Sequence, residues 1–146
     1  MSLPDGFAWA KLTPELLVRD LTRSLGFWRD LLGFRLAYDR PEEGFAYLDL
    51  DGAQVMLEEA FRPGRRWITG GLEPPYGRGI NIQFSVPHLD AVLARLAVAS
   101  WPLYMPVEET WYRAGAMESG VRQFLVQDPD GYLLRPQQAL GLRPVG

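Results

Sequence analysis

The chain repeats one order of structural elements, and this repeat constrains its fold more than any other feature. Residues 12–60 predict a strand, a helix and three strands, and residues 80–138 predict the same order. Two short motifs recur in matching places: Val18-Arg-Asp-Leu as Val86-Pro-His-Leu, and Asp51-Gly52 as Asp130-Gly131. The sequence therefore predicts an α+β protein of two β-α-β-β-β modules, whose curled mixed sheets surround a cleft.

The elements of the two modules follow from apolar spacing and from turn residues. The first helix is expected from apolar residues at helical spacing, with Asp20 as its N-cap and Gly33 as its stop. The second is expected within residues 88–100, and "QDPDGY" predicts a tight hairpin turn between the last two strands. The expected strands lie within residues 12–20, 34–40, 44–50, 53–59, 80–86, 102–109, 122–127 and 132–138.

The predicted organisation is a single domain, residues 1–146. Its first module spans residues 10–60, and its second spans residues 80–140. Between them, residues 61–79 are rich in Gly and Pro and predict a long loop. A second long loop is expected at residues 108–120, where the second module is longer than the first.

Composition excludes several classes of function. The 146 residues carry a net charge of −3, which argues against a nucleic-acid partner. The absence of cysteine excludes disulfides and thiolate sites, and a single histidine excludes any site that needs two from one chain. No apolar run is long enough to span a membrane, and the N-terminal stretch lacks a signal pattern, so we expect a cytoplasmic protein.

Three segments carry a resemblance to a known family: "VRDLTRSLGFWRDLLGF", "AYLDLDGAQVMLEE" and "QFLVQDPDGYLL". Together with the duplicated modules they resemble the vicinal oxygen chelate superfamily over residues 10–140. This superfamily includes glyoxalase I, extradiol dioxygenases, fosfomycin-resistance enzymes and bleomycin-resistance proteins. The run from "VEETWYRAG" to "YLLRPQQ" looks most similar to the bleomycin-resistance branch.

The resemblance also implies where a metal would be bound. The four positions that hold metal ligands in the superfamily's metalloenzymes correspond here to Thr13, Met56, Asn81 and Arg135. None of the four is a good ligand for a divalent metal, and the charge of Arg135 would repel one. We therefore expect no metal and no other cofactor. Arg135 is expected instead to line the cavity and to pair with Glu58.

The expected ligand-binding residues are of three kinds: apolar residues that line the cavity, polar residues that contact the ligand, and aromatic residues in loops. Trp67, Trp111 and Tyr112 lie in predicted loops, where a large aromatic side chain needs a partner chain or a flat ligand to cover it. Glutamates at 108, 109 and 118 flank Trp111 and suit a cationic guest. The full expected set is Tyr47, Met56, Glu58, Trp67, Asn81, Trp111, Tyr112, Phe124 and Arg135, with no catalytic residue.

Three functions remain open. The favoured one is metal-independent sequestration of a bulky, planar and cationic small molecule by a homodimer, as in bleomycin-resistance proteins. The alternative is an enzyme of the same fold, such as an isomerase or lyase or a dioxygenase-related enzyme, that uses Glu58 as a base. A third is a sensor or interaction module, because the fold alone does not determine function. We expect neither a nucleic-acid nor a membrane partner.

Overall fold

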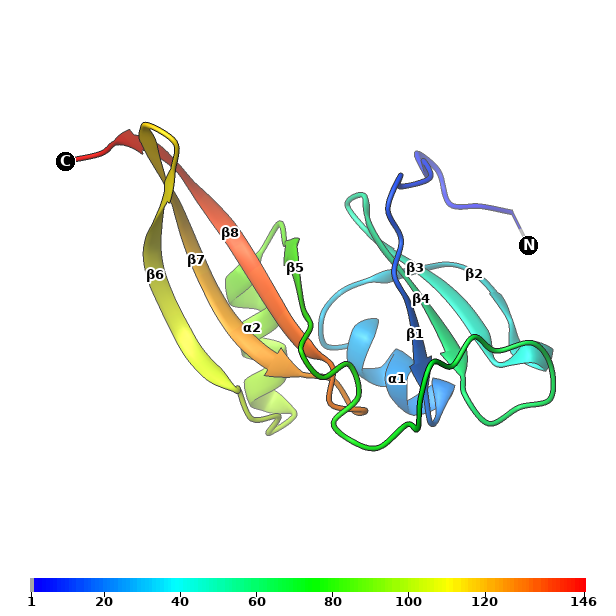
Figure 1. Cartoon of the computed structure of the whole chain (residues 1–146). Helices are drawn as coiled ribbons and strands as arrows, with labels where there is room; N and C mark the ends of the chain where they lie inside the picture. The colour runs from blue at the N-terminus through cyan, green and yellow to red at the C-terminus, as the bar shows by residue number, and fades with distance from the viewer. Residues whose placement is uncertain (1) are drawn as a thin grey trace. The chain divides into compact units, whose positions relative to one another are not determined.

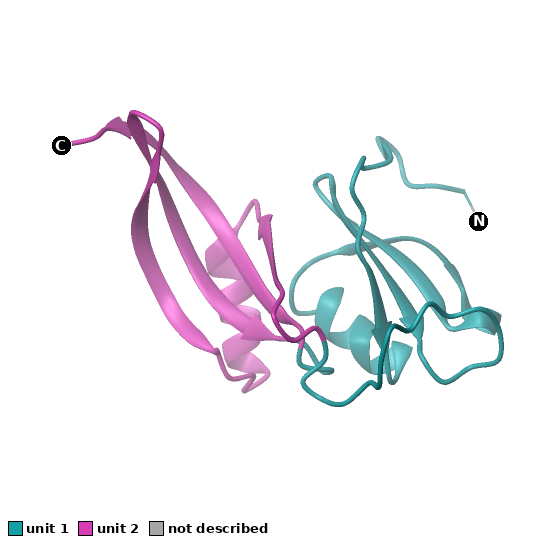
Figure 2. Ribbon diagram, in the orientation of Figure 1, with its two compact units in different colours: residues 1–76, 128–131 teal, residues 77–127, 132–146 magenta. Residues whose placement is uncertain are grey.

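The computed structural model describes residues 2–146 and divides into two compact units. Unit 1 consists of residues 2–76 together with Asp128–Gly131, and unit 2 consists of Gly77–Gln127 together with Tyr132–Gly146 (Figure 2). Each unit contains one four-stranded mixed sheet and one α-helix, in the order β-α-β-β-β (Figure 1). The predicted α+β fold class is confirmed.

Unit 1 is built on a sheet with the strand order β1-β4-β3-β2. β1 runs parallel to β4, and the other neighbours are antiparallel. The face that packs on the helix is apolar, and it includes Leu16 and Leu57 at 7% and 0% exposure. The elements are β1 (Glu15–Val18), α1 (Leu21–Trp28), β2 (Arg35–Arg40), the 3₁₀ helix η1 (Pro41–Glu43), β3 (Phe45–Leu50) and β4 (Ala53–Glu59).

α1 begins as predicted but ends earlier. The Asp20 side chain accepts a hydrogen bond from the backbone N–H of Arg23, so the predicted N-cap is confirmed. The helix ends at Trp28, and turns follow as far as Gly33, whose φ is 94°. The expectation that the helix continues to Gly33 is therefore wrong. The backbone N–H of Phe34 bonds to the carbonyl of Trp28, which directs the chain back toward β2.

Unit 2 repeats this plan with the strand order β5-β8-β7-β6. β5 runs parallel to β8, and the other two pairings are antiparallel. Phe84, Leu134 and Pro136 are buried on the face that packs on the helix. The elements are β5 (Asn81–Ser85), α2 (Leu89–Val98), β6 (Met105–Ala114), β7 (Met117–Gln127) and β8 (Leu133–Pro144).

The loop expected at residues 108–120 is in fact a hairpin. β6 and β7 pair almost without interruption, from Glu108 opposite Gln123 to Ala114 opposite Met117. Gly115, at a φ of 65°, forms the turn between them. The prediction failed because the extra length of the second module was assigned to a loop, whereas these residues extend β6 and β7 as cross-strand pairs.

The predicted hairpin turn at Asp128–Gly131 is confirmed, since β7 and β8 pair antiparallel on either side of it. The turn itself packs within unit 1. Asp130 accepts hydrogen bonds from the backbone N–H and the Nε of Arg19, at 3.1 and 2.8 Å. Asp128 accepts one from the Trp28 indole at 3.2 Å. Both carboxylates of the turn thus hold it on α1 and the end of β1.

No helix in the described residues is long and apolar enough to cross a membrane.

Candidate functional site

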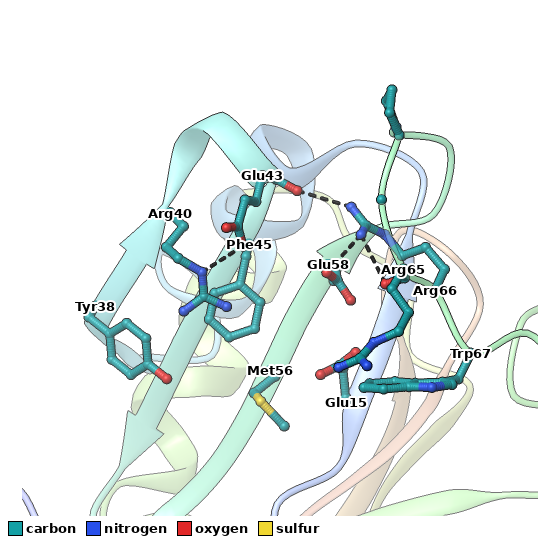
Figure 3. Close-up of a pocket in the computed structure, with 12 residues that line it drawn as sticks. Glu15, Tyr38, Arg40, Glu43, Phe45, Met56, Glu58, Arg65, Arg66 and Trp67 are labelled. Atoms are coloured by element: carbon teal, nitrogen blue, oxygen red, sulfur yellow. Dashed lines mark hydrogen bonds and ion pairs between the residues drawn. The ribbon is translucent and has the colours of Figure 1, made fainter.

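A pocket of about 560 Å³ lies in unit 1 (Figure 3). Its walls come from all four strands of the sheet, from η1 and from the segment that follows β4. The lining residues are Glu15, Tyr38, Arg40, Glu43, Phe45, Met56, Glu58 and residues 63–67. The predicted site residues Met56, Glu58 and Trp67 therefore lie together in one pocket.

Strand alternation places the polar residues at this pocket. β1 and β4 run in parallel register, with Glu15 opposite Met56 and Leu17 opposite Glu58. Successive residues of a strand point to opposite faces of the sheet. Because Leu16 and Leu57 face the helix, their neighbours Glu15, Met56 and Glu58 point into the pocket.

The Glu58 carboxylate is held by an arginine from the segment after β4. Its Oε1 lies 3.0 Å from Nη1 of Arg66, and the two side chains are only 11% and 9% exposed. Arg66 also donates to the backbone carbonyls of Glu59 and Glu43, at 2.9 and 3.1 Å. The expectation that Glu58 pairs with Arg135 is therefore wrong, because a buried guanidinium of the same unit already occupies it.

The second carboxyl group of the pocket, Glu15, has a strongly perturbed pKa. Partial removal from solvent raises the pKa of Glu15 from 4.5 to about 7, assisted by a hydrogen bond with Glu58 and by the negative charge of Glu58. The charges of Arg66 and Arg40 act in the opposite direction and are weaker. At pH 7 Glu15 is therefore protonated in about half of the molecules.

Aromatic and cationic side chains form the rest of the pocket wall. The guanidinium of Arg40 lies 4.0 Å from the ring centroid of Phe45, and its Nε donates to Glu43 at 2.6 Å. The guanidinium of Arg65 lies 4.6 Å from the ring centroid of Trp67, which is 69% exposed. The wall thus already contains planar cations stacked on aromatic rings.

Tyr47 lies behind this wall. Its side chain is only 4% exposed, and its ring stacks on Tyr38 with the centroids 5.2 Å apart. Its hydroxyl donates to Oε1 of Gln54 at 2.7 Å and lies 3.1 Å from Oγ1 of Thr13. Tyr47 therefore supports the pocket residue Tyr38 and does not itself line the pocket.

The other predicted site residues belong to unit 2. Asn81 and Arg135 lie on the sheet face that points away from α2, because their neighbours Phe84, Leu134 and Pro136 fill the opposite face. Tyr112 shares the face of Arg135, since its hydroxyl accepts a hydrogen bond from Gln123 at 2.7 Å. The structure thus brings three of the predicted residues to one sheet face.

Trp111 and Phe124 lie elsewhere in unit 2. Trp111 points to the face opposite Tyr112, where its ring covers Gly120 and stacks with Arg143 at 4.0 Å. Phe124 has no exposed surface. It is part of the core beneath α2 and presents no atoms to a ligand.

The residues at the superfamily's metal positions do not suit a metal. The Thr13 hydroxyl is bonded to Tyr47, Met56 offers only a thioether, and Arg135 is cationic. Within residues 2–146, no three His, Asp or Glu side chains cluster as a metal site would need.

Sequence reasoning missed several residues of the pocket. Glu15 was detectable in principle, because it follows the implied ligand position Thr13 by two residues and so shares its strand face. Arg66 carried no signal, since it lies in an irregular segment whose path back to Glu58 follows no sequence period. For Tyr38 and Phe45 the sequence predicted only that they lie in strands, and not that they line a pocket.

Comparison with known proteins places these observations in a family. The model of the Glyoxalase/Bleomycin resistance protein/Dioxygenase superfamily matches residues 10–135. A superfamily member from Vibrio splendidus 12B01 is 38% identical over 86% of this chain and 95% of its own, with a TM-score of 0.39. TioX from Micromonospora sp. ML1 is 23% identical to this chain. The match covers 92% of this chain and 100% of TioX, with a TM-score of 0.69.

A glyoxalase/bleomycin resistance protein/dioxygenase from Alicyclobacillus acidocaldarius is 22% identical over 88% and 90% of the two chains, with a TM-score of 0.58. The search of curated proteins returned no match. The family match covers most of the chain, and the two modules have the β-α-β-β-β order that the resemblance implied. The chain belongs to the Glyoxalase/Bleomycin resistance protein/Dioxygenase superfamily.

Proposed function

We propose that this protein binds a planar, cationic small molecule in the pocket of unit 1 without the help of a metal, as bleomycin-resistance proteins sequester their drug. The observation that carries the proposal is a pocket of about 560 Å³ that combines aromatic side chains with the carboxyl groups of three glutamates, two of which are paired with arginines. This volume lies within the range of pockets that hold drug-sized ligands.

The charges of the pocket favour a cation at one place. Glu43 and Glu58 each have an arginine partner, Arg40 and Arg66. Glu15 has no ion-pair partner among residues 2–146. A positively charged guest that reaches ionised Glu15 can form an ion pair that the described residues do not form, although the charges of Arg66 and Arg40 already act on this carboxylate.

The stacking of Arg65 on Trp67 supports a planar guest. A guanidinium is a flat cation, and it lies 4.6 Å from the centroid of this exposed indole. A planar cationic ligand would replace Arg65 over the ring and keep the cation–π attraction, while its larger rings bury more apolar surface.

The test is a fluorescence titration with ethidium, a planar cation, and with the uncharged ring system phenanthridine. Ethidium should bind more tightly than phenanthridine, and Trp67→Ala should weaken ethidium binding by about tenfold, the loss typical of an aromatic anchor. Tyr104→Ala is the matched control, because Tyr104 is 63% exposed and lies in unit 2. Equal affinity for both ligands, or equal losses in both variants, would refute the proposal.

One observation favours a second candidate, an isomerase or lyase. A pKa of about 7 suits Glu15 to act as a general base near neutral pH. Incubation with small α-carbonyl compounds in deuterated water tests this function. Deuterium uptake that depends on Glu15, and that Glu42→Gln leaves unchanged, would favour the enzyme, because Glu42 does not line the pocket.

A further inference from the structure

We propose that the free edge of the unit 2 sheet pairs with the same edge of a second copy of this chain, in an antiparallel register centred on Trp111. The edge is formed by β6, whose only neighbour in the sheet is β7 (Figure 1). It contains no residue of the unit 1 pocket, so the proposal does not depend on the function proposed for that pocket.

The edge strand β6 is long and regular enough to accept a further strand. It has ten residues, and on its outer side no strand of the described residues 2–146 pairs with it. From Glu108 to Ala114 it is paired with β7 without a bulge, and none of these residues is proline. A free strand edge presents unpaired N–H and C=O groups, which favour pairing with another strand.

Three residues of β6 form a row on one face of the strand: Glu109, Trp111 and Arg113. Glu109 and Arg113 are exposed, and neither forms an ion pair among residues 2–146. Trp111 is held between them, since its Nε1 donates to Oε1 of Glu109 at 3.3 Å and its ring lies 4.0 Å from the guanidinium of Arg143. The row is therefore an acid, an aromatic residue and a base, with the two charges equally far from Trp111 along the strand.

This order is complementary to itself in an antiparallel pair. A twofold axis at Trp111 places Glu109 opposite Arg113 of the partner subunit, and by symmetry the same pair forms a second time. An axis at Glu109 would instead place two carboxylates opposite one another. An axis at Thr110 or Tyr112 would leave neither charge opposite its counterpart. The charges of β6 therefore favour the register centred on Trp111.

The complementarity also identifies the occupant of the edge. The main-chain hydrogen bonds of an added strand supply affinity for any extended chain, and the side chains select which chain binds. Opposite charges that face one another across two strands stabilise the pair, and like charges destabilise it. The sequence that complements Glu109 and Arg113 is that of β6 itself, so a second copy of the chain fits the edge.

The experiment uses two charge-reversal variants of the whole chain, Glu109→Arg and Arg113→Glu, in sedimentation velocity over a dilution series. Each variant alone places like charges opposite one another twice, so each should dimerise about tenfold more weakly than the unchanged chain. An equal mixture of the two variants should recover the dimer, because both pairs across the mixed dimer again join opposite charges. The double variant Glu109→Arg/Arg113→Glu should recover it as well.

The control is Glu73→Arg, which makes the same change of charge at an exposed residue of unit 1 and should leave dimerisation unchanged. A monomeric unchanged chain would overturn the proposal and would make a strand of another protein the occupant to seek. Dimers of unchanged strength in both single variants, or a mixture that stays as weak as its components, would overturn it too. Circular dichroism of each variant establishes that it remains folded.

Discussion

The raised pKa of Glu15 leads to a prediction that can be tested without a ligand. Glu15 should titrate near pH 7 in the native chain, and not near the ordinary value of 4.5. The charged and titratable groups that act on it are Glu58, Arg66 and Arg40. Carbon-13 NMR of the glutamate side-chain carboxyl groups measures this pKa directly.

Glu58→Gln is the informative perturbation. It removes the negative charge beside Glu15 and leaves the Arg66 charge without its partner, and both changes favour ionised Glu15. The pKa of Glu15 should fall, but not to 4.5, because removal from solvent is the largest cause of the shift and remains in the variant. Glu42→Gln, an exposed residue outside the pocket, should have no effect.

The same titration determines how cation binding depends on pH. With a pKa of about 7, Glu15 is ionised in about one tenth of the molecules at pH 6 and about nine tenths at pH 8. Affinity for ethidium should therefore rise by about tenfold between these values. Glu15→Gln should abolish the rise.

The free energy of unfolding should change with pH in the opposite direction to ethidium affinity. Because the folded chain raises the pKa of Glu15 above 4.5, ionisation disfavours the folded state, and stability should fall as pH rises from about 5 to 8. A native Glu15 that titrates near 4.5, or an unchanged pKa in Glu58→Gln, would refute the reasoning about the acid pair.

Three further predictions concern the ion pair, the metal and the assembly. Arg66→Met should lower the free energy of unfolding by about 3 kcal/mol in urea denaturation, because it leaves the buried Glu58 charge unpaired. Arg65 is exposed, so Arg65→Met should lower the free energy of unfolding by less than about 1 kcal/mol. Elemental analysis of the purified protein should find no stoichiometric transition metal; about one zinc, iron, manganese or nickel per chain would contradict this. Sedimentation at micromolar concentration should show a homodimer, since the exposed apolar residues Leu142 and Tyr104 need cover, and a monomer would count against shared sites.

Much of the local structure could be predicted from the sequence. Apolar spacing and the Asp20 cap were sufficient to predict where α1 begins, although not where it ends, and the Asp-Pro-Asp-Gly turn was sufficient to predict the β7–β8 hairpin. Strand alternation predicted that Met56 and Glu58 share one strand face, and both residues line the pocket. These features depend on neighbouring residues and on strand period, which a sequence displays directly.

The tertiary structure alone decided which charges meet. Glu58 pairs with Arg66 and not with Arg135, because the irregular segment after β4 folds back and is held by backbone carbonyls. Burial is the largest cause of the high pKa of Glu15, and the parallel pairing of β1 and β4 adds the hydrogen bond and the negative charge of Glu58. Ion pairing and pKa depend on distance and burial in space, and these are set only when the chain has folded, by strand pairing for Glu15 and by the path of the irregular segment for Arg66.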